Sequence, residues 1–304
     1  MSQTNRCLSE TWWKVSKEDE YKKNNNLKAS DVMLIKDWIR KKPHLPQLND
    51  NQIIMFLRVC DYSLELSKKS IDLNYTTRSN LPEFFSKRDL DDARVQTAME
   101  HAHFGVIPDS VNNDCYIICK VLEVDLSKFI LEDFIKYCFM FHDMTHLEFG
   151  SCDGYIYIVD MKNVNLALLL RLQISVVGHM LKFWQDCSTY RIKAFHIVNG
   201  GHIFKRVLQV FQQFFNSELL KLIHLHDNFE TLKEFINSDI IPSEYGGLGK
   251  SLKELQGETD ELLEKYKDWF REEENQRIDE SKKNFSRRST DESIQGSFRK
   301  LDID

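Results

Sequence analysis

No apolar run in this sequence approaches the ~20 residues that a membrane-spanning helix needs. The longest purely apolar pieces, such as residues 166–170, are far too short. The first twenty residues, MSQTNRCLSETWWKVSKEDE, contain no hydrophobic segment of the kind found in a signal peptide. The seven cysteines form no paired framework, and Cys115 and Cys119 fall in a strand-like run, which is typical of reduced core thiols. We therefore expect a soluble, cytoplasmic protein.

Basic residues are not in excess, because the net charge is -6 at pH 7. This argues against general nucleic-acid binding, which depends on a basic surface. The sequence contains no Gly-x-Ser-x-Gly turn and no Gly-x-Gly-x-x-Gly after a strand. Gly246 to Ser251 ends like a phosphate-binding loop, but the first glycine of that motif would fall at Glu244 and no strong strand precedes it. We expect neither an enzyme nor a cofactor.

Two histidine pairs are candidate metal ligands. His142 and His146 are four residues apart on a predicted helix with Asp143 beside the first, a spacing that can bind zinc. No third ligand follows at the spacing of a zinc protease. His224 and His226 share a face of a predicted strand, which is an equally weak signal. We expect no metal, and keep a zinc hydrolase only as a third hypothesis.

The stretch from Tyr190 to Phe215 organises the chain. Its first part, IKAFHIV at 192–198, has the length and β-branched composition of a buried parallel strand. Asn199, Gly200 and Gly201 follow. These residues adopt a positive φ at low energetic cost, so a sharp turn can form there. The period then changes to that of a helix with a Phe-rich face and a Lys, Arg and Gln face. A strand that feeds such a helix suggests a cover over something apolar.

The whole chain divides into three parts. Its hydrophobic content of 42% is sufficient for a sizeable core. Residues 1–95 are all helical, residues 96–250 alternate strand and helix, and residues 251–304 hold a helix and a charged tail from about 272. Alternation predicts an α/β domain with a mostly parallel sheet. Strands are expected at 115–121, 155–160, 192–198 and 219–226. Helices are expected at 9–24, after Ser30, after Asp50, at 63–78, at 131–149, from Asn165 to Trp184, at 202–215, at 229–236 and at 252–269.

Five segments resemble the CRAL-TRIO family of lipid-transfer proteins, which includes the cellular retinaldehyde-binding and alpha-tocopherol transfer proteins and the clavesins. They are DNQIIMFLR (50–58), GYIYIVD (154–160), RIKAFHIVN (191–199), IHLH (223–226) and IPSEYGG (241–247). Singly each segment is weak, but together, in the family's order, they are specific. The tail at 296–304 looks like the insect branch of the family.

The resemblance implies a helical N-terminal domain before an α/β lipid-binding domain with a cavity. A mobile amphipathic helix, here 202–215, would cover the cavity and open at a membrane. Tyr137 and Phe141 fall at positions that line the cavity in the tocopherol protein. The complete predicted pocket consists of Tyr137, Phe141, Ile158, Val177, Leu181, Phe204, Val207, Leu208, Phe211 and Phe215.

The family's basic cleft for phosphoinositide headgroups is largely missing from this sequence. Its four positions fall on Cys60, Arg191, Glu218 and Leu222, so only Arg191 keeps its charge. Two turns also depart from the family, because Thr189 and Gly200-Gly201 stand where prolines are usual. The residues left to meet a membrane headgroup are Arg191, Lys193, Lys205, Arg206 and Lys221.

The resemblance implies an intracellular carrier that holds a retinoid, tocopherol, carotenoid or other lipid and transfers it between membranes. The alternative is a phosphoinositide-binding membrane-trafficking module without cargo. We expect a monomer that contacts membranes transiently and binds no nucleic acid.

Overall fold

A computed structural model describes residues 7–226 and 228–283 of the chain. Its strands are β1 (Ala102–Asp109), β2 (Asp114–Val121), β3 (Gly154–Asp160), β4 (Ile192–Val198) and β5 (Ile223–His226). The helices before the sheet are η1 (Glu10–Trp12), α1 (Lys17–Lys23), α2 (Ala29–Arg40), α3 (Asp50–Val59), α4 (Leu64–Asn80), α5 (Pro82–Phe85) and α6 (Ala93–Met99). Those between the strands are α7 (Leu131–Phe149), α8 (Leu166–Leu169), α9 (Ile174–Asp186), α10 (Gly201–Phe211), η2 (Gln212–Phe214) and α11 (Ser217–Lys221). The last are α12 (Phe229–Leu232), η3 (Ser243–Tyr245), α13 (Leu252–Lys265), α14 (Lys267–Glu273) and η4 (Glu280–Lys282).

The five strands form one sheet in the order β1-β2-β3-β4-β5. β1 pairs antiparallel with β2, and the other neighbours are parallel. One row of the register crosses the sheet from Ile118 through Ile158 and His196 to His224. The predicted α/β class with a mostly parallel sheet is therefore confirmed.

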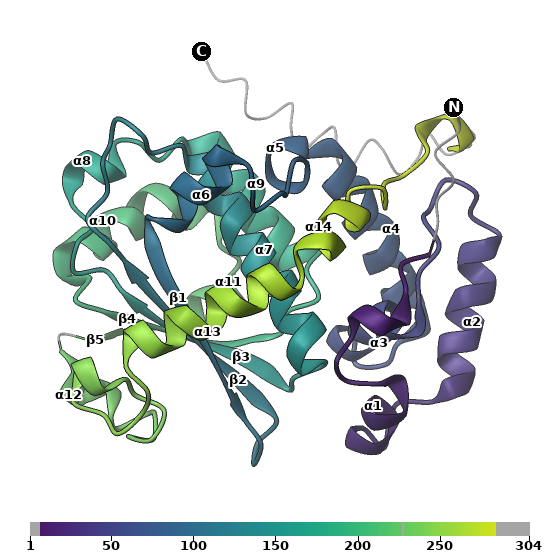
Figure 1. Cartoon of the computed structure of the whole chain (residues 1–304), viewed down its shortest axis with the longest axis horizontal. Coiled ribbons are helices and arrows are strands. Elements are labelled where there is room, and N and C mark those ends of the chain that lie inside the picture. Colours follow the sequence, from purple (N-terminus) through teal and green to yellow (C-terminus); the bar gives the residue numbers. More distant parts are fainter. Residues whose placement is uncertain (1–6, 227, 284–304) are drawn as a thin grey trace.

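The two faces of the sheet belong to different cores. Tyr157 and Phe195 lie on the face that carries α7 and α9, whereas Ile158 and Val198 pack with Leu232 of α12 and with α13 on the other. Gly105 of β1 lets α13 approach closely, since a Cβ there would lie 2.7 Å from the Cβ of Leu255. Figure 1 shows α13 crossing the sheet and α14 continuing toward the N-terminal helices.

Helices α1 to α4 surround a core of their own at the other end of the molecule (Figure 1). The C-terminal segment returns to this core, where Ile278 is buried and the Nε2 of Gln52 donates to Oε1 of Gln276 at 2.7 Å. Glu273 and Gln276 are only 2% and 1% exposed. The expectation of a solvated tail from about 272 is therefore wrong for Glu273, Gln276 and Ile278, which are buried, whereas Glu272 and Asn275 are exposed. The predicted tail features at 286–290 and 296–304 lie outside the described residues.

A buried charge network joins the two ends of the chain to the centre of the fold. Asp143 of α7 forms ion pairs with Arg78 at 2.9 Å and Arg88 at 2.6 Å. Glu273 of α14 pairs with the same two arginines at 2.9 and 3.1 Å. Arg88 has no exposed side-chain surface. Burial of the ions is tolerable because each charge meets opposite charges on two sides.

Several elements differ from the sequence prediction. The helix expected at 9–24 forms η1 and α1, the helix expected at 252–269 forms α13 and α14, and α6 was not predicted. The apolar run at 219–226 divides into α11, which Asn216 caps through the Leu219 amide, and the short strand β5. The helix expected from Asn165 to Trp184 is interrupted and forms α8 and α9. β1 was not predicted. In the described part of the chain, no helix is both long and apolar enough to cross a membrane. All seven cysteines lie in that part and are unpaired.

Candidate functional site

The cover segment, which we define as Gly201–Phe214 (α10 and η2), leaves the end of β4 through a tight turn. Asn199 has φ 56° and Gly201 has φ 46°, so the predicted Asn-Gly-Gly turn is confirmed. The Nδ2 of Asn199 donates to the Oδ1 of Asp160 at 2.8 Å. The hydroxyl of Tyr245 donates to the other oxygen of Asp160 at 2.8 Å. The start of the cover segment is thus fixed to β3.

The end of the cover segment is fixed to α9 by one side chain. The Nε2 of Gln185 donates to the Phe214 carbonyl at 2.7 Å, and its Oε1 accepts from the Asn216 amide at 2.8 Å. Gly178 of α9 leaves room for Phe214, since a Cβ there would lie 2.9 Å from its ring. The segment therefore has two defined points of attachment.

Between these points, apolar contacts alone hold the cover segment. From Ile203 to Phe211, where the side chains are described, none forms a hydrogen bond or an ion pair with another described residue. α10 also has no side-chain cap at Gly200, no acid in its first turn and no base in its last. Phe211 is 4% exposed, but Phe204, Val207 and Leu208 keep part of their surface accessible. The protein does not fully bury the inner side of this strongly amphipathic helix.

Aromatic side chains lie on the sheet and on α9 beside the cover segment. The rings of Tyr157 and Phe195 stack at 4.7 Å, and Trp184 lies 5.8 Å and 5.9 Å from them. Phe195 and Trp184 are only partly buried. The Nε1 of Trp184 is nevertheless buried and has no acceptor among the described residues. This surface is apolar, and among its described side chains Nε1 of Trp184 is a buried donor without an acceptor.

The structure brings five of the ten predicted pocket residues into one cluster. They are Val177 and Leu181 of α9 with Val207, Phe211 and Phe215. Phe204 and Leu208 belong to the same helix and are partly buried.

The other three predicted pocket residues lie elsewhere. Tyr137 and Phe141 are fully buried against Phe104 of β1, with ring centroids 5.2 and 4.8 Å apart. Ile158 is on the opposite face of the sheet, because side chains alternate along a strand and Tyr157 occupies the near face. The predicted set also omits Trp184 and Phe195. An aromatic pair in register on neighbouring strands, Tyr157 and Phe195, was the available signal.

The predicted headgroup residues do not form one patch. Arg191 binds Asp61 at 2.5 Å and donates to the carbonyls of Arg58 and Val59 at the end of α3. Lys193 pairs with Asp114 at 2.5 Å, and Lys221 pairs with Glu218 at 2.7 Å. These three flank the start of β4 or β5.

Lys205 and Arg206 lie beyond the other end of β4, in α10, and are exposed. Seven strand residues separate the two groups, or about 23 Å. Cys60 and Leu222, the two uncharged positions of the family's cleft, are partly buried. A single basic cleft is therefore not assembled here.

Exposed aliphatic side chains occur on α8, α9 and α10. Leu166 and Leu170, in α8 and the loop after it, are 53% and 79% exposed. Ile174 begins α9, the helix on which α10 packs, and is 49% exposed. Val210 of α10 itself is 48% exposed. Together with Lys205 and Arg206, these residues give the region an apolar and basic surface.

The helical histidine pair is built into the core. The Nδ1 of His142 donates to the Cys138 carbonyl at 2.6 Å, so its Nε2 accepts from the Tyr157 hydroxyl at 2.7 Å. Burial lowers the pKa of His142 to about 4 and that of His146 to about 3. The ring of His146 packs 4.5 Å from Tyr190. Neither ring is arranged as a metal ligand.

Three further histidines meet on the far face of the sheet. His196 stacks with His224 and His226 at 5.1 Å, and its Nδ1 lies 2.9 Å from the Nε2 of His226. His224 and His226 thus share a face, as their spacing predicts. Across the described residues, no group of three or more His, Cys, Asp or Glu side chains has a geometry suited to a metal.

The sequence and the fold of this chain both match known proteins. Residues 108–247 match the CRAL/TRIO domain family, and residues 24–95 match a family described as Pinta-like, UBA domain. "Alpha-tocopherol transfer protein-like" of Mus musculus is 23% identical over 241 residues, which cover 77% of this chain and 69% of the relative. "Clavesin-2" of Homo sapiens is 22% identical over 237 residues, covering 75% and 72%. The solved structure titled "Crystal structure of Sfh5" matches the fold with TM-score 0.52 and 15% identity, covering 77% of this chain and 93% of that one.

Proposed function

This chain is a CRAL/TRIO domain protein, and on that premise we propose that it carries a small hydrophobic ligand between membranes. The ligand would lie between the cover segment and the aromatic face of the sheet. Retinoids, tocopherols, carotenoids and other lipids of similar size are the candidate classes.

The observation that supports this proposal most directly is the attachment of the cover segment. It is fixed at Asn199 and at Gln185, and only apolar contacts hold the part between them. An ordinary core helix buries its apolar face completely, whereas Phe204 and Leu208 keep accessible surface. A hydrophobic guest that fills this layer would complete the burial.

The energetics favour a purely apolar guest. Enclosing ~500 Å² of apolar ligand surface gives on the order of 12 kcal/mol of gross transfer free energy. The loss of the ligand's freedom reduces this value substantially. A pocket of Phe, Leu and Val side chains therefore retains a lipid without a charge contact. The Nε1 of Trp184 supplies one donor that would orient a hydroxyl or carbonyl group.

A membrane is the partner that would allow release. Opening the cover segment exposes its Phe-rich side, which is unfavourable in water but favourable at a bilayer interface. Leu166, Leu170 and Val210 already present aliphatic surface beside it. Lys205 and Arg206 add positive charge that an anionic leaflet attracts, at ~1 kcal/mol for each residue. The proposal thus describes a monomeric cytoplasmic carrier, without catalysis, that contacts membranes only transiently.

Native mass spectrometry of the purified full chain tests the proposal. We expect a bound lipid-sized mass that solvent extraction recovers. Leu208→Asp should abolish retention, because a carboxylate would face the apolar ligand. Leu208 is preferred to Phe211, whose burial in the cluster means that replacement would disturb packing.

Gln209→Asp is the matched control, since Gln209 is exposed on the same helix. It should retain the ligand at the wild-type level. If the wild-type protein neither carries a lipid nor extracts one from liposomes, yet still binds membranes, the cargo-free trafficking module becomes the better account. Equal retention in both variants would show that α10 does not cover the ligand.

A further inference from the structure

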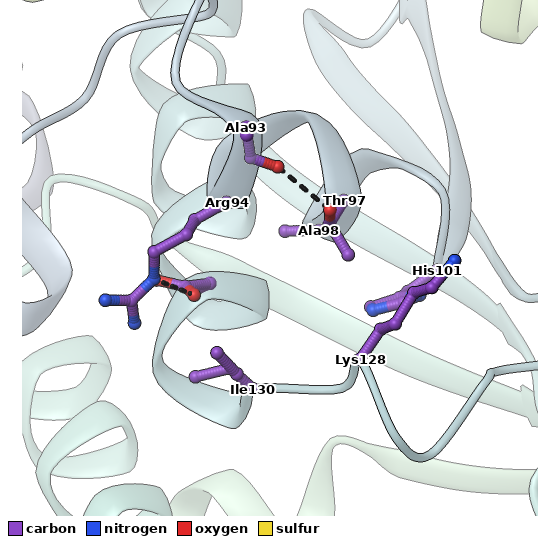
Figure 2. Close-up of a pocket in the computed structure, with 8 residues that line it drawn as sticks. Ala93, Arg94, Thr97, Ala98, His101, Lys128 and Ile130 are labelled. Atoms are coloured by element: carbon purple, nitrogen blue, oxygen red, sulfur yellow. Dashed lines mark hydrogen bonds and ion pairs between the residues drawn. The ribbon is translucent and has the colours of Figure 1, made fainter.

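A second hollow of about 190 Å³ lies between α6 and the start of α7 (Figure 2). It is separate from the cover segment, because no residue of α9 or α10 lines it. Its volume exceeds by far the space that one water needs. The lining residues are Ala93, Arg94, Thr97, Ala98, His101, Lys128, Ile130 and Asp133.

One lining side chain is buried and lacks a partner. His101 is 4% exposed and its ring packs 5.4 Å from Phe129. Its Nε2 is buried with no hydrogen bond to any described residue. The backbone of Lys128 lies beside the ring and favours its charged form, which weakly opposes the effect of burial on its pKa. Lys128 lines the hollow as well, so an imidazole and a lysine side chain both border it (Figure 2).

The start of α7 provides further donors. α7 has 19 residues, and its N-cap position is Ile130, which has no side chain able to accept from the first amides. The first intrahelical bond runs from the Phe134 amide to the Ile130 carbonyl at 3.1 Å, so the amides before Phe134 have no partner within the helix. The helix dipole adds partial positive charge at this end. Such helix ends bind anions.

The one carboxylate that lines the hollow is already paired. Asp133 accepts from the Nε of Arg94 at 2.7 Å, drawn as a dashed line in Figure 2, and lies 3.9 Å from the ammonium of Lys136. The ammonium of Lys128 is only 4.0 Å from Asp125, and both side chains are largely exposed. Arg94 keeps its other guanidinium nitrogens free for solvent or ligand, since its side chain is 62% exposed. Among the lining side chains, Arg94 and Lys128 face the single carboxylate of Asp133, and the acids Asp125 and Glu132 lie just outside the lining.

We propose that this hollow binds a phosphate monoester, with His101 donating from a protonated Nε2, Lys128 pairing with the phosphate, and the first α7 amides completing the contacts. A tetrahedral dianion matches donors that converge from a helix end, a ring and an ammonium group. The small apolar side chains Ala93, Ala98 and Ile130 leave room for the organic part of the ester.

Binding should take up a proton on His101. Burial lowers the pKa of the free ring, and Glu100 and Asp125 only partly oppose this, so the ring is neutral at pH 7. A dianion beside Nε2 stabilises the imidazolium and raises the pKa. The positive charges of Lys128 and Arg94 oppose this rise in the pKa of His101, and the negative charge of Asp133 supports it. The effect of the phosphate on the pKa must therefore exceed that of the two bases. Affinity should therefore increase as the pH falls from 7.5 to 6.5.

NMR titration of the His101 ring in the full chain tests this site. Inorganic phosphate and glycerol 3-phosphate should each raise the His101 pKa by about one, a tenfold preference for the protonated ring. Vesicles with phosphatidic acid, compared with phosphatidylserine vesicles of equal charge, show whether a lipid headgroup also enters. A shift with the soluble esters alone assigns a free metabolite, and an additional shift with phosphatidic acid assigns a headgroup; both support a phosphate site.

Lys128→Ala should weaken phosphate binding about fivefold to tenfold, whereas Lys253→Ala, an exposed lysine on α13, should leave it unchanged. His101→Gln should remove the pH dependence while the fold, followed by the amide spectrum, remains. The proposal is overturned if sodium chloride at the same ionic strength shifts His101 as much as phosphate does. It is also overturned if wild-type His101 does not respond to phosphate.

Discussion

Single buried histidines determine how this protein responds to acid. His142 and His146 lie in α7 with pKa values lowered by burial to about 4 and about 3. In the unfolded chain the same groups titrate near ~6.5. The unfolded state therefore binds more protons below that pH, and folding stability decreases as the pH falls.

We predict an acid-sensitive free energy of unfolding. The contribution of these histidines is complete above about pH 6.5 and is lost progressively toward pH 4, by up to ~1.4 kcal/mol per pH unit for each ring. Urea unfolding at pH 7.0 and at pH 5.0 measures the difference. His146→Phe, which packs similarly against Tyr190, should reduce the slope by one proton. An unchanged slope in this variant would contradict the assignment.

Gln185 is a second residue whose role is testable, because both ends of its amide bond the end of the cover segment. Gln185→Leu should loosen residues 212–216 at a cost of ~1–2 kcal/mol for two partly exposed hydrogen bonds. We expect faster amide hydrogen exchange there and faster loss of a fluorescent lipid. Gln213→Leu, at an exposed position of the same turn, serves as the control. Equal exchange rates in the two variants would argue against the role of Gln185.

At the scale of elements, the charges of α10 decide which membranes the protein prefers. Arg191 and Lys221 are engaged with Asp61 and Glu218, whereas Lys205 and Arg206 of α10 are exposed. An exposed pair of bases attracts anionic surfaces in general and carries no geometry for one headgroup.

We therefore predict that transfer to liposomes depends on anionic charge and on salt, with little preference for a phosphatidylinositol bisphosphate. The measurement compares acceptor liposomes of matched charge that contain phosphatidylserine or the bisphosphate. The double variant Lys205→Gln and Arg206→Gln should slow transfer to both acceptors equally. A large acceleration by the bisphosphate alone, lost in Arg191→Ala, would show that a headgroup site forms after all.

The sequence predicts helices and strands best where a regular apolar pattern extends over many residues. The 19 residues of α7 and the strands β2, β3 and β4 lie within a residue or so of the prediction. The run at 219–226 was mistaken for one strand, because its apolar residues fit a short helix as well as a strand and the cap at Asn216 favours the helix. β1 escaped prediction because its alternation is weak and it ends at Pro108 and Asp109.

The candidate site was predictable only in part, for a geometric reason. Helical spacing places Val207 and Phe211 on one side of α10, and the structure confirms that they share a cluster with Val177. The spacing of residues in a strand does not indicate which face of the sheet a given helix covers. The predicted set therefore includes Ile158, which lies on the face opposite to Tyr157. Tyr137 and Phe141 came from the resemblance, and here they pack on Phe104 instead.

At the scale of the whole molecule, four charges connect segments that are far apart in the sequence. Arg78, Arg88, Asp143 and Glu273 lie in or near α4, α6, α7 and α14. Burial alone would raise the pKa of Asp143, but Arg78 and Arg88 hold it below its ordinary value. Removing one member leaves an uncompensated charge in the interior.

We predict that Arg88→Met lowers the free energy of unfolding by ~3–5 kcal/mol. Arg40→Met, which removes an exposed arginine paired with Asp37, should cost less than ~1 kcal/mol. Urea unfolding at pH 7 measures both. Similar losses for the two variants would mean that the network contributes no more than a surface ion pair.

The return of the C-terminal segment to the first helices has a consequence during synthesis. Helices α1 to α4 leave the ribosome before the sheet, yet Gln276 and Ile278, which complete their core, follow them by about 200 residues of chain. At roughly 5–20 residues per second, the helical core stays unfinished for about 10–40 s while the intervening ~200 residues are made. During that interval its apolar surface is available to chaperones, and the helical core is complete only when residues 276–278 pack on it.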